Sequence, residues 1–352
     1  MPYLEYCLDA AFQAIKRIEA ELIVVDNHST DNTIGTMQKR FPSVKLLVNK
    51  ENTGFARACN QGAAIAQSNL LLFLNPDCII SASCLHACLE FLEQNTDTGA
   101  LGVQMINGSG EYLPESKRGN PDPLSSFYKL TGLSSFFQRS KHVNAYYHPH
   151  TNRESIEVVP VLSGAFMMVK KPVFEKAGGF DERYFMYAED IDLSLSMEKL
   201  GYKNIYLGNQ VVLHFKGTST PGSASYNRHF YGAMKLFVKK YWSNYFKRSL
   251  LLTGILMREK ISLLKMIVRP KKNTYLAVTD WNLKGDEEAI AQAKELLSPD
   301  PHNIIRSIPV KGCVILLCLG TSFSYEEAIR MMKENPGFPY RLYKSQMVNI
   351  IG

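Results

Sequence analysis

Residues 71–77 read LLFLNPD, an apolar run that stops at Asn75, Pro76 and Asp77. A buried strand that ends in a carboxylate is one way in which an α/β sheet holds a metal ion against a phosphate. Asn-Pro-Asp is also ordinary turn chemistry, so this segment alone leaves both interpretations open. The neighbouring segments favour the first.

Two further apolar runs precede this one. Residues 22–25 (LIVV) end at Asp26 and Asn27, and residues 44–48 form the next expected strand. Short apolar runs that are bounded by turn residues and separated by helical patterns are typical of βαβ units and a parallel sheet. Ligands bind at the carboxyl ends of such strands, so we expect Asp26 and Asp77 to share one rim.

The segment after residues 44–48 is suited to an anion. Asn52 and Gly54 lie in the expected turn, and the helix that follows carries Arg57 and Asn60 near its start. Backbone amides at a helix start and a guanidinium both favour negative charge. We therefore predict a phosphate contact here.

The second half of the chain supplies an acidic cluster and a histidine. Glu189, Asp190 and Asp192 open an expected helix that ends at Gly201, with a buried stripe of Leu193, Met197 and Leu200. Acids in a first turn can simply complement the helix dipole. His214 follows an apolar run and stands beside Lys216, a glycine and three hydroxyl residues. A lone histidine there is usually structural, but this setting suits a phosphate or metal pocket.

Six motifs in order along residues 2–228 resemble glycosyltransferase family 2, in its rhamnosyltransferase-like branch. They are VVDN (24–27), NTGF (52–55), LNPD (74–77), GGFD (178–181), EDID (189–192) and His214. The resemblance implies a GT-A fold, which is an α/β fold with a nucleotide-sugar-binding mixed sheet flanked by helices. It also implies a nucleotide-sugar donor, a divalent metal (Mg²⁺ or Mn²⁺) and inversion at the anomeric carbon.

The resemblance assigns roles to matching positions. Asp77 and His214 would lie near the metal and diphosphate, and Asp190 would be the catalytic base. Glycosyl transfer needs a carboxylate to take the acceptor proton and a cation to neutralise the leaving diphosphate. Glu189 and Asp192 are expected on the acceptor side. The expected donor-binding residues are Asp26, Asn27, Asn52, Gly54, Arg57, Asn75 and Lys216.

The chain departs from the family pattern at three places. Ser196 and Thr218 stand where the branch commonly has Arg and Glu, and we expect these changes to tune phosphate or acceptor contacts. Family members also begin with a strand rich in Val and Ile, whereas residues 1–8 read as the helix that should follow it. From the resemblance we expect a strand to precede Met1, and we expect the chain without it to be poorly stable and to bind donor weakly.

Charge divides the chain into three expected parts. Eleven of the 40 basic residues and one of the 33 acidic residues lie at 235–272, so this segment carries +10 and the remainder −3. We predict a GT-A domain at 1–230, a basic amphipathic helical segment at 231–272 and a small α/β domain of unknown role at 273–352. In the last of these, Gly320, Thr321 and Ser322 follow an expected strand and could hold an anion.

The basic segment has the pattern of a helix that lies on an anionic membrane surface. At 100° per residue, one face holds Lys247, Arg258, Lys265, Arg269 and Lys272, and the other holds Leu252, Leu256, Leu263 and Ile267. A helix docked on the catalytic domain would show the same stripe. The seven cysteines are odd in number and form no zinc set, which favours reduced thiols in the cytosol. We expect a cytoplasmic enzyme, peripheral at the inner face of the cell membrane.

The sequence therefore predicts an inverting, metal-dependent hexosyltransferase. Its donor would be a dTDP- or UDP-sugar of rhamnose or another hexose, and its acceptor a lipid-linked glycan or cell-envelope polysaccharide; nucleic acid is not expected as a partner. Residues 108–156 are expected to contact the acceptor. Two alternatives stay open at this point: a GT-A nucleotidyltransferase, and a non-catalytic sugar-nucleotide-binding protein if Met1 is the true start.

Overall fold

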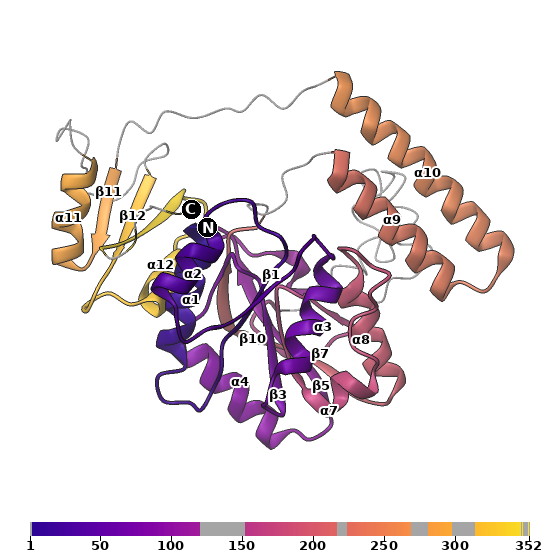
Figure 1. Cartoon of the computed structure of the whole chain (residues 1–352), viewed down its shortest axis with the longest axis horizontal. Helices are drawn as coiled ribbons and strands as arrows, with labels where there is room; N and C mark the ends of the chain where they lie inside the picture. The colour runs from indigo at the N-terminus through magenta and orange to yellow at the C-terminus, as the bar shows by residue number, and fades with distance from the viewer. Residues whose placement is uncertain are drawn as a thin grey trace.

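The computed structural model describes residues 2–119, 152–216, 224–268, 281–297 and 314–345, together with 347 and 351. Its first part alternates helices and strands as the apolar runs predict (Figure 1). These elements are α1 (Pro2–Ala14), β1 (Ile23–Asp26), α2 (Thr33–Arg40), β2 (Lys45–Val48), α3 (Phe55–Ile65), β3 (Leu70–Leu74), β4 (Cys78–Ile79), α4 (Ala82–Gln94) and β5 (Thr98–Ile106). The three strands expected at 22–25, 44–48 and 71–74 are confirmed.

The middle of the chain completes the central sheet. Its elements are the 3₁₀ turn η1 (Pro114–Ser116), β6 (Lys117–Arg118), β7 (Ile156–Val158), β8 (Val161–Leu162), β9 (Phe166–Lys170), α7 (Lys171–Lys176), α8 (Glu189–Lys199) and β10 (Lys203–His214). The order in the main sheet is β3-β9-β5-β10-β4, with β7 also paired to β10, while β6 pairs with β8. The sheet is mixed, because β5 runs parallel to β10 and β3 runs antiparallel to β9. The predicted mixed sheet is confirmed.

The purely parallel arrangement expected for the first strands is wrong in one respect. β1 and β2 form a parallel pair of their own, and β3 pairs instead with β9 from the second half of the chain. Apolar periodicity indicates where a strand forms but not which strand it pairs with, since partner choice depends on contacts distant in sequence. β10 likewise replaces two expected strands: a register shift between Leu207 and Val211 lets one strand continue to His214.

Helices cover both faces of the main sheet. On one face α1 and α4 pack against β5 and β9 in a cluster that includes Ala11, Leu85, Met105 and Met168. On the other face α3, α7 and α8 pack in a second cluster that includes Met167. Met167 and Met168 point to opposite faces because successive strand residues alternate. The sheet therefore has a buried layer on each side.

The C-terminal part is a small parallel sheet, as the βαβαβ pattern predicts. It consists of β11 (Trp281–Gly285), α11 (Glu287–Leu297), β12 (Val314–Leu319), α12 (Tyr325–Glu334) and β13 (Tyr340–Lys344), in the strand order β11-β12-β13. The first strand of the pattern was expected at 275–278, outside the described residues, and the first strand that the structure describes here is β11. We call these elements the C-terminal unit.

The C-terminal unit packs against the main domain (Figure 1). Ile315 and Met332 share one buried cluster with Tyr6 of α1, Ile79 of β4 and Phe215, which follows β10. Polar contacts add to this interface: Tyr325 donates to Asp9 (2.8 Å), and Lys344 forms an ion pair with the same carboxylate (2.5 Å). The C-terminal unit is thus packed against α1, β4 and the end of β10.

The predicted anion loop of the C-terminal unit is occupied by a side chain of this chain. Asp286 accepts hydrogen bonds from the Ala289 amide (3.0 Å) and from both the amide and hydroxyl of Ser322 (3.0 and 2.7 Å). The Ala289 amide and the Ser322 donors hold the pKa of Asp286 below its usual range, at about 2. The Gly320–Ser322 turn therefore already serves a carboxylate, which removes the reason to assign it an external anion.

The basic segment forms two helices, α9 (Ala224–Tyr241) and α10 (Tyr245–Val268), which lie side by side (Figure 1). Leu251 and Ile255 of α10 are buried against Tyr231 and Val238 of α9. No helix in the described ranges is long and apolar enough to cross a membrane.

Candidate active site

The two predicted metal-binding residues lie together. The turn after β3 places Asp77 beside the end of β10, where His214 is in register with Cys78 of β4. His214 Nε2 lies 3.3 Å from Asp77 Oδ1, and both side chains are buried. The Phe215 amide donates to the Asp77 carbonyl (3.0 Å), which fixes the two strand ends to each other.

The residues around this pair fit a divalent cation. Ligand atoms of Asp77, Cys78 and His214 lie within 4.8 Å of one another. His214 Nδ1 is buried and has no hydrogen-bond partner in the described part of the chain. Burial, and next the Asp77 charge, raise the pKa of the Cys78 thiol well above its usual value, and the thiol donates to the Ala165 carbonyl (3.4 Å). The carboxylate and the imidazole are thus the better donors.

Asp190 lies at the start of α8 and contacts the turn between β8 and β9. Its Oδ2 accepts hydrogen bonds from the Arg118 guanidinium (2.6 Å) and the Gly164 amide (3.0 Å), and its Oδ1 accepts one from the Ile191 amide (2.8 Å). A Cβ added at Gly164 would lie 3.2 Å from the Asp190 Cβ, so a small residue suits this position. Arg118 was not predicted from the sequence.

One short segment connects Asp190 to the Asp77 turn. Gly164 donates to Asp190, and the next carbonyl, that of Ala165, accepts from the Asn75 amide (2.9 Å). Two predicted site residues, Asn75 and Asp190, are therefore held by adjacent residues of the same chain segment. Residues 164–165 therefore link the carboxylate expected to act as base to the turn that bears Asp77.

The backbone before α8 is strained. Tyr187 and Ala188 have φ values of 74° and 67°, which is the left-handed region that side chains other than glycine adopt at a cost. This turn delivers Glu189 and Asp190 into the interior rather than toward solvent, and both are buried. Such strain is concentrated at functional sites in other proteins.

Glu189 is buried beside Asp190. Its Oε2 has no hydrogen-bond partner among the residues described. Burial and the neighbouring Asp190 charge raise the pKa of Glu189 to about 8. At neutral pH the Glu189 carboxyl is mostly protonated.

Replacing Glu189 by Gln should change how stability depends on pH. Between about pH 4.5 and 8 the unfolded chain loses the Glu189 proton while the folded chain keeps it, so wild-type stability falls as pH rises through this window. Glu189→Gln lacks this ionisation. Its free energy of unfolding relative to wild type, measured with denaturant, should therefore increase from pH 5 to pH 8, whereas Glu198→Gln, an exposed control on the same helix, should show no such trend. A flat difference for Glu189→Gln would contradict the raised pKa.

Asp192 has a different setting from its neighbours. Its carboxylate forms an ion pair with Lys240 (2.7 Å) and accepts from the Tyr241 hydroxyl (2.9 Å), both on α9. Lys240 also contacts Asp181 (2.8 Å). The prediction that Asp192 lies on the acceptor side is therefore not supported by this geometry, which favours a role in joining α8 to α9. Leu200, expected in the buried stripe of α8, is exposed, while Leu193 and Met197 are buried.

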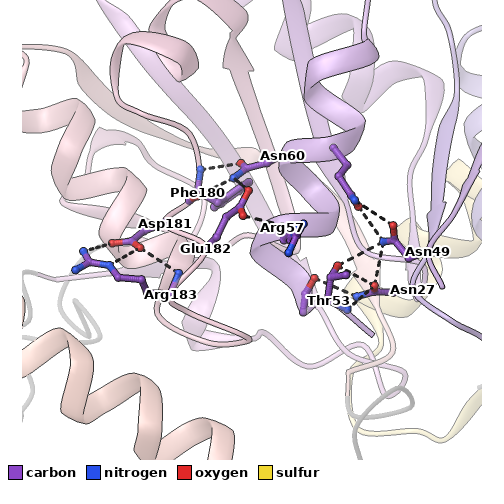
Figure 2. Close-up of polar contacts among 11 residues, drawn as sticks. Asn27, Asn49, Thr53, Arg57, Asn60, Phe180, Asp181, Glu182 and Arg183 are labelled. Carbon is purple, nitrogen blue, oxygen red and sulfur yellow. Dashed lines mark hydrogen bonds and ion pairs between the residues drawn. The ribbon is translucent and has the colours of Figure 1, made fainter. Parts of the chain in front are cut away.

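Three of the residues predicted to bind donor, Asn27, Asn52 and Gly54, are joined by hydrogen bonds where the end of β1 meets the loop between β2 and α3. Figure 2 shows that Asn27 is the centre of this network: its Oδ1 accepts from the Thr53 amide (2.9 Å) and from Asn49 (3.1 Å). Its Nδ2 donates to Asn52 and to the Gly54 carbonyl, each at 3.0 Å. The Asn27 amide thus shapes the loop.

Gly54 connects this loop to the segment before α8. It has a φ of 88°, and an added Cβ would lie 2.6 Å from the Phe185 carbonyl. That carbonyl accepts a hydrogen bond from the amide of Phe55, the first residue of α3 (2.7 Å). Only glycine meets both conditions, so the predicted importance of this position has a structural reason.

Arg57 and Asn60 of α3 contact the turn after α7 (Figure 2). Asn60 exchanges hydrogen bonds with the backbone of Phe180 (2.8 and 3.0 Å), and Arg57 lies 3.9 Å from Glu182. Arg57 and Glu182 are both exposed. Next to this turn, a surface cleft of about 440 Å³ is lined in part by Asn60, Asp181 and Lys240. The lining does not include Asp77, His214 or Asp190.

The other predicted donor-side residues already have partners in the chain. Asp26 is buried at the end of β1 and accepts from the Ser29 amide (2.9 Å). Lys216 forms an ion pair with Glu115. The segment expected to contact the acceptor is described only at 108–119 and 152–156.

Comparisons with known proteins identify the family of this chain. The profile of glycosyl transferase family 2 matches residues 1–178. The N-acetylglucosaminyl-diphospho-decaprenol L-rhamnosyltransferase of Mycobacterium tuberculosis is 32% identical over 232 residues, which cover 62% of this chain and 74% of that protein. Rhamnosyltransferase WbbL of Escherichia coli is 28% identical over 150 residues, which cover 43% of this chain and 53% of that protein.

Among solved structures, a mannosyltransferase from Pyrobaculum calidifontis in complex with GDP-Man and Mn²⁺ is similar, with a TM-score of 0.46 and 16% identity. The similarity covers 77% of this chain and 73% of that one. The family profile spans half of the chain, and the mycobacterial relative matches beyond it. The chain belongs to glycosyl transferase family 2 and is a glycosyltransferase.

Proposed function

We propose that this enzyme transfers a hexose, with rhamnose as the first candidate, from a nucleoside-diphosphate donor to a lipid-linked glycan or cell-envelope polysaccharide. The observation that carries the proposal is the segment at 162–165, which contacts both Asp190 and the turn that bears Asp77. The mycobacterial relative, whose name specifies rhamnose transfer to a lipid diphosphate sugar, supports the substrate class. A dTDP- or UDP-sugar is the proposed donor.

The proposed reaction is a single displacement. Asp190 takes the proton of the acceptor hydroxyl while the acceptor oxygen bonds to the anomeric carbon and the bond from that carbon to the phosphate oxygen breaks. The configuration inverts, and the nucleoside diphosphate leaves. Asp77 and His214 would hold Mg²⁺ or Mn²⁺, which neutralises the leaving diphosphate when it is bound.

Incubation of the purified protein with Mn²⁺ and a panel of nucleotide sugars tests this proposal. A productive donor should raise the melting temperature and be slowly hydrolysed in the absence of acceptor. Transfer to a lipid-linked sugar diphosphate should then form a product with inverted anomeric configuration. Retention of configuration, or neither stabilisation nor turnover with any sugar nucleotide, would contradict the proposal.

We also propose that α10 attaches the enzyme to an anionic membrane surface, at the cytoplasmic face. Leu256 and Leu263 of the predicted apolar face are exposed, as a side that meets lipid requires, whereas Leu251 and Ile255, which were not assigned to that face, pack on α9. The outward side carries a further apolar stripe that was not predicted. Its members are Phe246, Leu250, Met257, Ile261 and Leu264, with exposed fractions from 44% to 77%.

Basic side chains flank this apolar stripe, with Lys247 and Arg258 on one side and Lys260 on the other. An exposed apolar stripe of this length is unfavourable in water. A helix at a membrane interface buries such a stripe in the lipid and places its basic side chains at the headgroups. The predicted basic positions beyond residue 264 lie where side chains are not described. The charge and the outward stripe together support an anionic lipid surface.

Changing Lys247, Arg258 and Lys260 to Glu should abolish binding to anionic vesicles. Each basic residue near such a surface contributes about 1 kcal/mol, and the attraction falls with salt. Vesicle sedimentation at low and high salt measures this loss. Lys16→Glu and Arg17→Glu, at two exposed positions after α1, are the controls, since they also reverse basic charges but lie outside α10. Binding that persists in the α10 variant, or that ignores salt, would contradict the membrane proposal.

A further inference from the structure

Asp190 has no oxygen free of donors in this state. Two of its three hydrogen bonds come from backbone amides, those of Gly164 and Ile191, and the third comes from Arg118 (2.6 Å). The side chains of Arg118 and Asp190 are 14% and 10% exposed, so the ion pair lies at the edge of the interior. Oδ2 accepts two of the three, from Arg118 and Gly164, so an acceptor hydroxyl that approaches this oxygen must displace Arg118, the donor that is not a backbone amide.

Arg118 is the donor that can move. The two amides are fixed by α8 and by the β8–β9 turn, whereas Arg118 has a long side chain and ends the two-residue strand β6. A guanidinium that leaves its carboxylate near the interior needs another anion, because an unpaired buried charge is costly. Displacement of Arg118 is therefore favourable only if the incoming molecule supplies negative charge.

Two neighbouring cations, Lys117 and Lys216, are paired with glutamates and not with a predicted site residue. Lys117 pairs with Glu157 and lies over the Tyr206 ring, and Lys216 pairs with Glu115. Neither glutamate is a candidate for chemistry. Arg118, in contrast, is held by the carboxylate proposed as the base.

We propose that Arg118 binds a phosphate of the acceptor, so that acceptor binding itself frees Asp190. This inference rests on the proposed function and narrows it: the acceptor is a sugar diphosphate in which the reacting hydroxyl and the phosphate belong to the same sugar residue. The hydroxyl takes the place of the guanidinium at Asp190, and the guanidinium forms a bidentate pair with phosphate oxygens. A neutral acceptor would leave Arg118 on Asp190.

Steady-state kinetics with two acceptors tests the proposal. Both carry the same sugar; one is a short-chain lipid diphosphate and the other a neutral alkyl glycoside. Arg118→Met should lower kcat/KM for the diphosphate acceptor by about 10- to 100-fold, the range for losing a charge-assisted contact, and should leave kcat/KM for the neutral acceptor the same or higher, because with that acceptor the guanidinium only occupies Asp190. Arg118→Lys keeps the charge without the fork and should fall between. Arg183→Met, a cation paired with Asp181, is the control and should keep the wild-type ratio.

Donor hydrolysis without acceptor gives a second readout and should be the same or higher in Arg118→Met, because water, like a neutral acceptor, leaves the guanidinium of the wild type on Asp190. An equal loss for both acceptors would make Arg118 a structural support of Asp190, and a loss of donor hydrolysis would assign it to the donor diphosphate; either result overturns the proposal, as does an unchanged ratio. If wild type transfers sugar but the acceptor ratio does not respond, this inference alone fails. If wild type turns over no sugar nucleotide, the proposed function fails with it.

Discussion

Replacing Asp77 by Ala should abolish sugar transfer and binding of Mn²⁺ together. Asp77 is the carboxylate of the buried pair with His214, and an imidazole alone is a weak site for a hard cation. His214→Ala should weaken both properties strongly but leave the carboxylate in place. Isothermal titration with Mn²⁺ and a transfer assay over a range of metal concentrations measure the two effects.

Cys78→Ala is the matched control for the metal prediction. The Cys78 thiol lies in the same group but donates to Ala165, so its removal should leave the dependence on metal unchanged. Full metal-dependent turnover in Asp77→Ala would show that the cation is held elsewhere. A loss of metal binding in Cys78→Ala would add the thiol to the ligands.

Replacing Asp190 by Asn should slow transfer by about 10²–10⁴-fold, because the amide keeps the shape of the carboxylate but cannot accept the proton. Donor affinity, measured by thermal shift with a productive sugar nucleotide, should change little. The hydrogen bonds from Arg118 and Gly164 go to one oxygen, so the variant can keep both when its amide oxygen takes that position.

Asp192→Asn separates the two acids of the cluster. The Asp192 carboxylate is paired with Lys240 and Tyr241, so its variant should lower the melting temperature more than the rate of transfer. The opposite pattern, in which Asp192→Asn stops transfer and Asp190→Asn is nearly silent, would mean that the base has been assigned to the wrong carboxylate.

Local pattern predicted the elements well and their partners poorly. The strands Ile23–Asp26 and Leu70–Leu74 and the helix that begins at Glu189 follow from apolar runs and turn residues. The pairing of β3 with β9 does not, because no spacing along the chain encodes which strand edge is adjacent. The approach of Asp77 to His214 came from the resemblance to the family, since the two residues are far apart in sequence.

Residues whose importance comes from tertiary contacts could not be found in the same way. Arg118 ends a strand of two residues, too short for any periodicity, and its partner Asp190 comes from a distant helix. The outward apolar stripe of α10 was also missed. A helix that is apolar on two sides shows no single stripe in the sequence, and only the position of α9 shows which side remains exposed.

The C-terminal unit supports the strand ends of the candidate active site, although none of the predicted site residues belongs to it. Its cluster encloses Ile79 and Leu213, the residues directly beside Cys78 and His214, and it encloses Phe215, whose amide holds the Asp77 carbonyl. The two strand ends that carry Asp77 and His214, the predicted metal ligands, are therefore packed against residues contributed late in the chain. A substitution that disrupts the packing of α12 or β12 should therefore shift these strand ends. In an assay, such a folding defect would be measured as a lower affinity for the cation.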